Sequence, residues 1–403
     1  MLVKKASARE IIVTVLFLLL LFLMCLESVT SIEVISKLLR YIDELITLFL
    51  FCYVLRHVSL ILFPKKQLIV CWIALIFIGI GSSCIYRYQA LVPVVVDAFV
   101  LSSRFIIGYL SATIYCRRNK KNISDNLNIV IRIVTIVLFI LTIHDIFLPP
   151  FFAKSDYRYF MYGLQLMFPH ATYLAVAAAT LLIFLGYKNY NNKNTVYMIM
   201  ATIVGVMTLR GKALAFFFIY WVLYLMIIVF KSKRYVLALP GGGIMAILIG
   251  WNTIVDNFNT SLYRPRAILM RDGIELMLSH FPFGTGFASF GSAMAATYYS
   301  PLYTWLGYPE NKGMGPINSE FLHDGFWATI CAQFGVFGLF FFIGIVLFFI
   351  KISIEKTKKN RYAGVAILTT MLYMLIASTA EAAFFNPTAL LMFMLLAIYE
   401  VEL

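Results

Sequence analysis

The chain has 403 residues, of which 62% are hydrophobic and 13% are charged. A soluble protein of this length cannot bury so much apolar surface, so the composition excludes a soluble globular protein and indicates a polytopic membrane protein. The net charge of +14 would suit an anionic partner, but its location along the chain decides its meaning.

Apolar runs long enough to cross a bilayer follow one another along the chain. A bilayer core of about 30 Å requires roughly 20 apolar residues per helix. The sequence predicts an all-α fold in which residues 1–403 form a single membrane domain of about twelve spans. The predicted spans are 11–26, 45–63, 68–86, 91–115, 127–148, 166–187, 195–209, 213–230, 235–252, 322–350, 362–380 and 388–400. No small-residue cleavage site follows the first run, which is therefore expected to be a retained helix.

The basic residues are concentrated in alternate loops of this topology. The N-terminus and residues 65–66, 117–121, 188–193, 231–234 and 351–361 form one set of loops, which carries the whole of the positive excess. This asymmetry follows the positive-inside rule, so it predicts that both termini are cytoplasmic. It also removes any need for a nucleic-acid partner.

Two charged residues, Asp97 and Arg104, fall inside the predicted fourth span. They are seven residues apart, about two helical turns, so they share a face and are well placed to line one interior cavity. Structural and functional explanations are both open for this pair.

An outward turn between the seventh and eighth spans carries Arg210-Gly211-Lys212. Two cations and free backbone N–H groups on so short a turn could hold the phosphates of a lipid-linked substrate, since guanidinium donors match phosphate oxygens in pairs. The alternative is an ordinary interfacial anchor.

The long outer loop, residues 253–321, contains a second cationic segment. Arg264-Pro265-Arg266 suits a helix start, and the amphipathic helix that follows is expected to continue to His280. Together with Arg271, these arginines form a candidate anion site, although a helix lying on the bilayer surface would have the same composition.

Aromatic residues crowd the same loop after residue 297. Tyr298, Tyr299 and Trp305 are candidates for stacking on a sugar, and Tyr303 and Tyr308 lie beside them. Anchoring at the membrane interface is the alternative explanation. The cysteines and histidines lack the spacing of metal ligands, so the sequence predicts no metal and no cofactor.

Several of these features occur in a recognisable order. Arg210-Gly211 stands at an outer helix junction, an Arg precedes the loop helix and Pro-Phe-Gly-Thr-Gly-Phe at 282–287, and His323-Asp324 precede Phe-Gly-Val-Phe-Gly at 334–338. In this order the chain resembles the O-antigen polymerase and O-antigen ligase family of bacterial inner-membrane glycosyltransferases. The resemblance covers residues 200–350, and the first two hundred residues only through topology.

The resemblance implies a glycan donor on undecaprenyl pyrophosphate, transferred outside the cytoplasmic membrane without a metal. It implies that Arg210 and Arg266, or Arg264, bind the pyrophosphate, and that His323 acts on the acceptor hydroxyl. Ligase-like members usually carry Asn after this His, whereas Asp324 follows here. Either His323 or Asp324 is therefore a candidate base, or Asp324 orients His323, and Glu320 is a further candidate.

The sequence thus predicts a polymerase of lipid-linked oligosaccharide repeat units for a surface polysaccharide such as O-antigen or capsule. The expected partners are that lipid-linked oligosaccharide and membrane lipid, and a chain-length regulator is a candidate. A ligase that moves finished polymer to a lipid or protein acceptor is the alternative of the same class. A twelve-helix transporter, with the charges inside the spans as its binding site, is the alternative from another class.

Overall fold

The computed structural model describes Ile12 and residues 14–21, 42–61, 65–119, 124–159, 161–231 and 264–402. The predicted ninth span at 235–252 and the loop residues 253–263 lie outside the described residues, as do residues 22–26 of the first predicted span. Residues 14–21 of that first span are helical.

Helices occupy the other predicted spans. They are α3 (Ile42–Arg56), α4 (Lys66–Tyr86), α5 (Leu91–Asn119), α6 (Ser124–Phe147), α7 (Ala171–Tyr187), α8 (Thr195–Val206), α9 (Gly211–Tyr224) with its π-helical continuation η3 (Leu225–Val229), α14 (Phe326–Lys359), α15 (Arg361–Ser378) and α16 (Pro387–Val401). Within the described ranges, five are long and apolar enough to cross a membrane, or six if the two halves of α5, which meet at 43°, form one span. The chain is therefore a mostly helical, multi-pass membrane protein, and the count of twelve spans stays a prediction.

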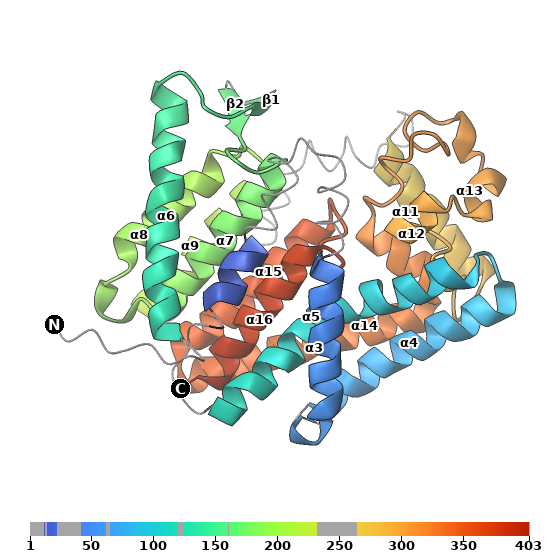
Figure 1. Cartoon of the computed structure of the whole chain (residues 1–403), viewed down its shortest axis with the longest axis horizontal. Helices are drawn as coiled ribbons and strands as arrows, with labels where there is room; N and C mark the ends of the chain where they lie inside the picture. The colour runs from blue at the N-terminus through green and yellow to red at the C-terminus, as the bar shows by residue number, and fades with distance from the viewer. Residues whose placement is uncertain are drawn as a thin grey trace.

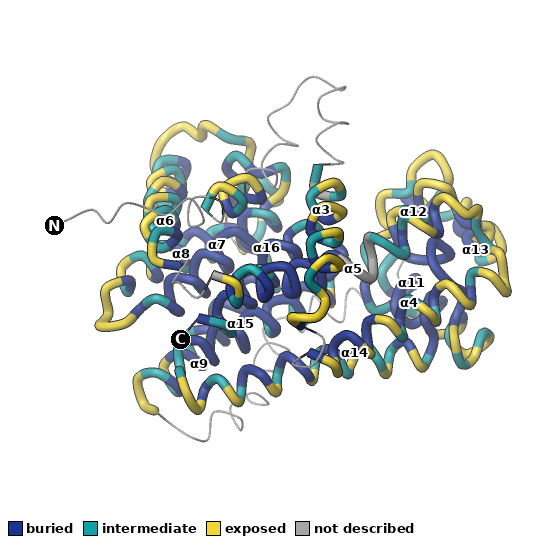
Figure 2. The backbone as a smooth tube through the Cα atoms, turned by 60° about the horizontal axis from the view of Figure 1, so that its bottom comes forward, coloured by how far each residue is buried: buried dark blue, intermediate teal, exposed yellow. Residues whose placement is uncertain are grey.

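The helices are arranged around a buried centre. In Figure 1, α5, α15 and α16 lie in the middle of the molecule, with α6–α9 on one side. On the other side lie α11 (Pro265–Ser279), α12 (Ala293–Thr297) and α13 (Pro301–Trp305). Helix α5 packs along α16, while α14 packs against α4, α11 and α15. Helix α7 is buried along almost its whole length, whereas α3, α4 and α6 have many exposed positions (Figure 2). Large apolar side chains such as Phe49, Phe77 and Ile133 are exposed on these outer helices. Outward-facing apolar side chains of this kind are expected where helices meet lipid.

The segment between α6 and α7 departs from the expected all-α fold. It forms an antiparallel hairpin of β1 (Lys154–Arg158) and β2 (Met161–Leu164), in which Tyr157 pairs with Tyr162. The two rings meet edge to face at 5.2 Å, and such aromatic cross-strand pairs stabilise short hairpins. The amide of Leu164 donates to the carbonyl of Met207 at 2.9 Å, which attaches the hairpin to the turn between α8 and α9.

Helix α14 also differs from its predicted span, 322–350. It begins at Phe326, after His323 and Asp324, and it is interrupted at Gly335, where φ is 64°. The amide groups of Thr285 and Gly286 donate to the carbonyls of Ala332 and Gln333 at 2.8 and 2.9 Å, so the Gly-Thr-Gly loop replaces hydrogen bonds that the interruption removes. A Cβ at Gly335 would lie 2.4 Å from the carbonyl oxygen of Pro282, so this close approach requires glycine.

The described part of the long loop folds into a small layer on α14. It contains α11 (Pro265–Ser279), α12 (Ala293–Thr297), α13 (Pro301–Trp305) and the 3-10 turn η4 (Tyr308–Glu310). Two other 3-10 turns, η1 (Val58–Leu60) and η2 (Tyr190–Asn192), lie in connections elsewhere in the chain. Its core includes Leu269, Phe290, Tyr303, Tyr308 and Met314. The loop helix predicted after Arg264 is α11, and the layer holds its first residues beside the start of α14.

Candidate active site

Arg210 stands at the junction of three elements. It is the N-cap residue of α9, and its Nη2 donates to Ser155 Oγ on β1 at 2.7 Å. The same nitrogen lies 2.9 Å from Nε2 of His170, the N-cap residue of α7, and Nη1 lies 3.6 Å from a carboxylate oxygen of Asp156. The hairpin and the start of α7 therefore fix the guanidinium at the end of the helix bundle.

The guanidinium of Arg210 keeps binding capacity. Its side chain is 12% exposed, and its Nε is buried without a hydrogen-bond partner among the described residues. Burial lowers the pKa of Arg210 and the positive charge of Arg158 lowers it further, yet a guanidinium stays charged in proteins. Its nearest hydrogen-bond partners, Ser155 and His170, are not carboxylates, and the Asp156 carboxylate at 3.6 Å is 65% exposed, so solvent weakens that ion pair and leaves part of the charge for an anion.

His170 lies beside this charge. Burial lowers its pKa, and the positive charge of Arg210 lowers it further. Its two ring nitrogens face hydrogen-bond donors, the Arg210 guanidinium and the Thr172 amide. An additional proton on the ring is therefore disfavoured.

Lys212 is paired across the site with the loop between α15 and α16. Its Nζ lies 2.6 Å from Glu381 Oε1, and the two side chains are 13% and 18% exposed. The positive charges of Arg210 and Arg266 both act on Lys212, so the three cations belong to one neighbourhood.

Arg266 brings the loop helix into this neighbourhood. Its Nη2 donates to Asp324 Oδ2 at 3.0 Å, with the two side chains 35% and 30% exposed. Arg264 is the N-cap residue of α11, and its Nε is buried without a hydrogen-bond partner in the described part of the chain. The predicted cations Arg210, Lys212 and Arg266, with their carboxylate partners Glu381 and Asp324, form what we name the Arg210 cluster.

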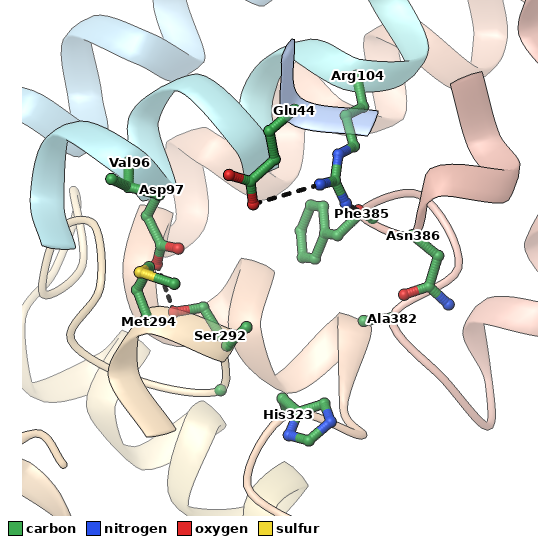
Figure 3. Close-up of a pocket in the computed structure, with 12 residues that line it drawn as sticks. Glu44, Val96, Asp97, Arg104, Ser292, Met294, His323, Ala382, Phe385 and Asn386 are labelled. Carbon is green, nitrogen blue, oxygen red and sulfur yellow. Dashed lines mark hydrogen bonds and ion pairs between the residues drawn. The ribbon is translucent and has the colours of Figure 1, made fainter. Parts of the chain in front are cut away.

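His323 precedes Asp324 of this cluster in the chain and lines a cavity of about 120 Å³. Figure 3 shows His323 on the loop before α14, with Asp97 and Arg104 from α5 and Glu44 from α3 around the same space. The expectation that Asp97 and Arg104 line one interior cavity is confirmed. Ser292 donates to Asp97, and Arg104 donates to the Phe385 carbonyl at 2.7 Å and lies 3.7 Å from Glu44 Oε1.

The remaining predicted site residues lie apart from these contacts. Arg271 is 62% exposed and donates to its neighbour Asp272 at 2.7 Å, which strengthens its hold on the proton and raises its pKa. Glu320 is exposed in the loop before α14. Its side chain has no ion pair or hydrogen bond to the Arg210 cluster among the described contacts.

The predicted aromatic residues divide into two groups. Tyr298 and Trp305 are 51% and 69% exposed, and Trp305 packs edge to face on Tyr88 at 5.6 Å. Tyr299 donates from its hydroxyl to the Met314 carbonyl at 3.0 Å. Tyr303 is fully buried and its hydroxyl accepts from the Gly291 amide, so it stabilises the loop layer and presents no surface to a sugar.

Several residues of the site were not singled out from the sequence. His170, Ser155 and Glu381 contact the predicted cations, and Asn386 lines the cavity with His323. The alternating tyrosines of the hairpin were an available signal for β1 and β2, and Glu381 was a carboxylate at the end of a predicted span. No sequence signal places His170 beside Arg210, because the two are 40 residues apart and meet only through packing.

Among the described residues, no three His, Cys, Asp or Glu side chains gather closely enough to hold a metal ion. A search against models of known protein families finds no match for this chain, and a search of curated proteins finds none either. A functional assignment therefore has to rest on the chemistry of the Arg210 cluster and the cavity beside it.

Proposed function

We propose that this protein is a membrane glycosyltransferase that polymerises undecaprenyl-pyrophosphate-linked oligosaccharide repeat units, and that it belongs to the O-antigen polymerase and ligase family. The observation that carries the proposal is the neighbourhood of Arg210, Lys212 and Arg266, from two distant segments, in which Arg266 binds Asp324, the residue after His323. Fixed cations next to a proton acceptor are what transfer from a pyrophosphate donor requires.

The cations would hold the leaving group. When the bond between the anomeric carbon and the phosphate oxygen breaks, its electron pair remains on that oxygen, and the lipid pyrophosphate gains negative charge. Arg210 supports this role best, because its Nε lacks a partner among the described residues and its two closest hydrogen-bond partners, Ser155 and His170, are not carboxylates. Donors that are already fixed in position stabilise such charge without reorganising.

His323 would act as the general base. Asp324 is engaged by Arg266 at 3.0 Å, whereas no hydrogen bond to the His323 side chain occurs within the described residues. In this scheme His323 takes the proton of the acceptor hydroxyl as the oxygen attacks the anomeric carbon, and Asp324 positions Arg266. This division of roles gives each member of the pair one function.

The proposal includes a membrane orientation. Arg210, the start of α14 and the start of α16 lie at one end of the bundle, and the basic residues near Lys65 and Lys356 lie at the other end of α14 and α16. By the positive-inside rule, the basic end faces the cytoplasm. The site then opens outward from the bacterial cytoplasmic membrane, with both termini inside and twelve spans in total.

Reconstitution with the lipid-linked substrate tests the function. Purified protein is supplied with pyrophosphate-linked repeat units extracted from source cells that lack this chain, and the products are separated on a gel. We expect a ladder from the wild type, none from Arg210→Ala, and an unchanged ladder from Lys154→Ala, which removes an exposed cation from the same hairpin that contacts Arg210. A full ladder from Arg210→Ala would overturn the proposal, and a product of one length on an added acceptor would indicate a ligase.

A further inference from the structure

The cavity that His323 lines also contains polar groups that the proposed donor chemistry does not use. Asp97 and Arg104 are 2% and 7% exposed, and both line it. Its volume of about 120 Å³ exceeds many times the roughly 10–15 Å³ that one water molecule needs by the same kind of measure. The cavity therefore has room for a polar group larger than a water molecule.

Asn386 is an unusual member of this lining. It is the N-cap residue of α16, a position where Asn normally accepts a hydrogen bond from the first turn of the helix, yet its side chain makes no such bond. In Figure 3 its amide lies at the cavity, on the side where Ala382 and His323 also lie. Both its donor and its acceptor are thus available to a bound group.

Two loops connect the cavity directly to the Arg210 cluster. His323 lines the cavity, and the next residue, Asp324, pairs with Arg266. Ala382 lines the cavity, and the preceding residue, Glu381, pairs with Lys212. Consecutive Cα atoms are about 3.8 Å apart, so in both loops the cavity and the cations are separated by about one residue.

We propose that this cavity is the acceptor subsite, which holds the terminal sugar of the acceptor glycan through Asp97, Arg104 and Asn386 so that its hydroxyl meets His323. This assignment rests on the proposed function and deepens it. The donor phosphate occupies the cationic side of the two loops, and the acceptor hydroxyl approaches from the other side.

The lining fits a hydroxyl-rich neutral sugar better than another anion. The carboxylates of Asp97 and Glu44 accept hydrogen bonds and repel phosphate, while Arg104 and Asn386 donate, so the space offers both acceptors and donors to the hydroxyl groups of a sugar. Met294 and Phe385 add an apolar surface on which the C–H face of a sugar ring can pack. An apolar lipid tail could form no hydrogen bond with these groups.

A two-substrate assay tests this assignment. The donor is the lipid-linked repeat unit described above, and the acceptor is the same oligosaccharide freed from its lipid and varied in concentration. Removing a side chain that forms a hydrogen bond with a neutral sugar hydroxyl should weaken binding about tenfold. Asn386→Ala should therefore raise the KM for the acceptor by about that factor. Inhibition by inorganic pyrophosphate, which reports on the Arg210 cluster, should be unchanged.

Two further variants keep the result interpretable. Asp97→Asn retains the size of the side chain and should also raise the KM for the acceptor, with thermal unfolding of the purified protein as the check on folding. Asn311→Ala is the matched control, because Asn311 is a partly buried asparagine of the loop layer outside the cavity. Its KM for the acceptor should equal that of the wild type.

The outcomes separate the two proposals. A wild type that elongates no lipid-linked unit overturns the proposed function, and the acceptor subsite with it. If the wild type is active and both Asn386→Ala and Asp97→Asn have the wild-type KM for the acceptor, the subsite alone is overturned. Weaker inhibition by pyrophosphate in Asn386→Ala, with an unchanged KM for the acceptor, would assign the cavity to the donor. This result would also overturn the acceptor subsite.

Discussion

The two ends of the helix bundle both contain cations paired with carboxylates, but the pairs differ in their exposure and in how completely they are hydrogen-bonded. At the end where α16 finishes, Glu400 accepts from Lys65 through one oxygen and from Tyr109 through the other. Nearby, Glu402 accepts from the amide and hydroxyl of Ser124. We name Lys65, Tyr109 and Glu400 the Glu400 cluster, and in it Lys65 is 3% exposed.

The Arg210 cluster at the opposite end is more open. Arg266 and Asp324 are about one-third exposed, and Arg210 has a buried nitrogen without a partner in the described structure. Closed, fully bonded ion pairs hold a fold in one arrangement, whereas exposed pairs with spare donors can accept an anion at low reorganisation cost. The comparison separates a structural use of charge from a proposed functional one.

Changing Arg210 to Lys should give the largest effect. Lysine keeps the charge, but it lacks the planar guanidinium that contacts Ser155 and His170 and can bind a phosphate at the same time. We therefore expect the polymerisation rate to fall by at least about 100-fold. The thermal unfolding temperature should be nearly that of the wild type. A normal polymerisation rate in Arg210→Lys would mean that the Arg210 cluster has a structural role, like the Glu400 cluster.

Breaking the Glu400 cluster should give the opposite pattern. Glu400→Gln leaves the charge of Lys65 buried without its carboxylate and should lower the free energy of unfolding by about 3 kcal/mol, measured by thermal unfolding in detergent. Below the unfolding temperature, the rate of polymerisation should be normal.

A second substitution checks the cause of this loss. Adding Lys65→Met to Glu400→Gln removes the unpaired charge and should restore most of the stability, because burying an apolar side chain carries no such penalty. A double variant as unstable as Glu400→Gln would show that the loss has another origin.

The depressed pKa of His170 predicts a pH dependence at the Arg210 end. Because the pKa is lower in the folded than in the unfolded protein, the unfolded state binds more protons below the ordinary value of about 6.5. Stability should therefore fall as the pH drops from about 6.5 towards the folded pKa, and this part of the loss should be absent in His170→Gln. Thermal unfolding of both proteins across this pH range measures the difference, and parallel curves would contradict the prediction.

Much of the fold could be predicted because the apolar runs are long and evenly spaced. The described helices lie where those runs lie, and α11 follows Pro265 as its sequence indicates. The hairpin and the interruption at Gly335 could not be predicted in the same way. Both depend on partners distant in sequence, Met207 for β2 and Thr285 for the carbonyls of α14, which no local pattern reveals.

The candidate site could likewise be predicted only where its residues follow a local sequence pattern. Arg210, Lys212 and Arg266 could be proposed from cations at expected helix ends. The pairing of Lys212 with Glu381 and the contact of Arg210 with His170 arise only from packing, and no spacing in the sequence encodes them. The cavity beside His323 likewise requires α3, α5 and the loop before α16 to meet.

The smallest effect should come from within the loop helix itself. Arg266 and Arg271 both lie on α11, but Arg266 reaches Asp324, whereas Arg271 is 62% exposed and pairs with the adjacent Asp272. Exposed ion pairs contribute about 0–1 kcal/mol, so Arg271→Ala should lower the polymerisation rate by no more than about fivefold.

Arg266→Ala should lower that rate by at least about tenfold, since a charge-assisted donor to the leaving phosphate and the partner of Asp324 are lost together. Polymerisation rates of the two variants, measured with the same lipid-linked donor, give the ratio. A larger loss from Arg271→Ala than from Arg266→Ala would mean that the anion binds on the exposed face of α11. The partly exposed pair of Arg266 and Asp324 would then be structural, like the Glu400 cluster, despite its open position.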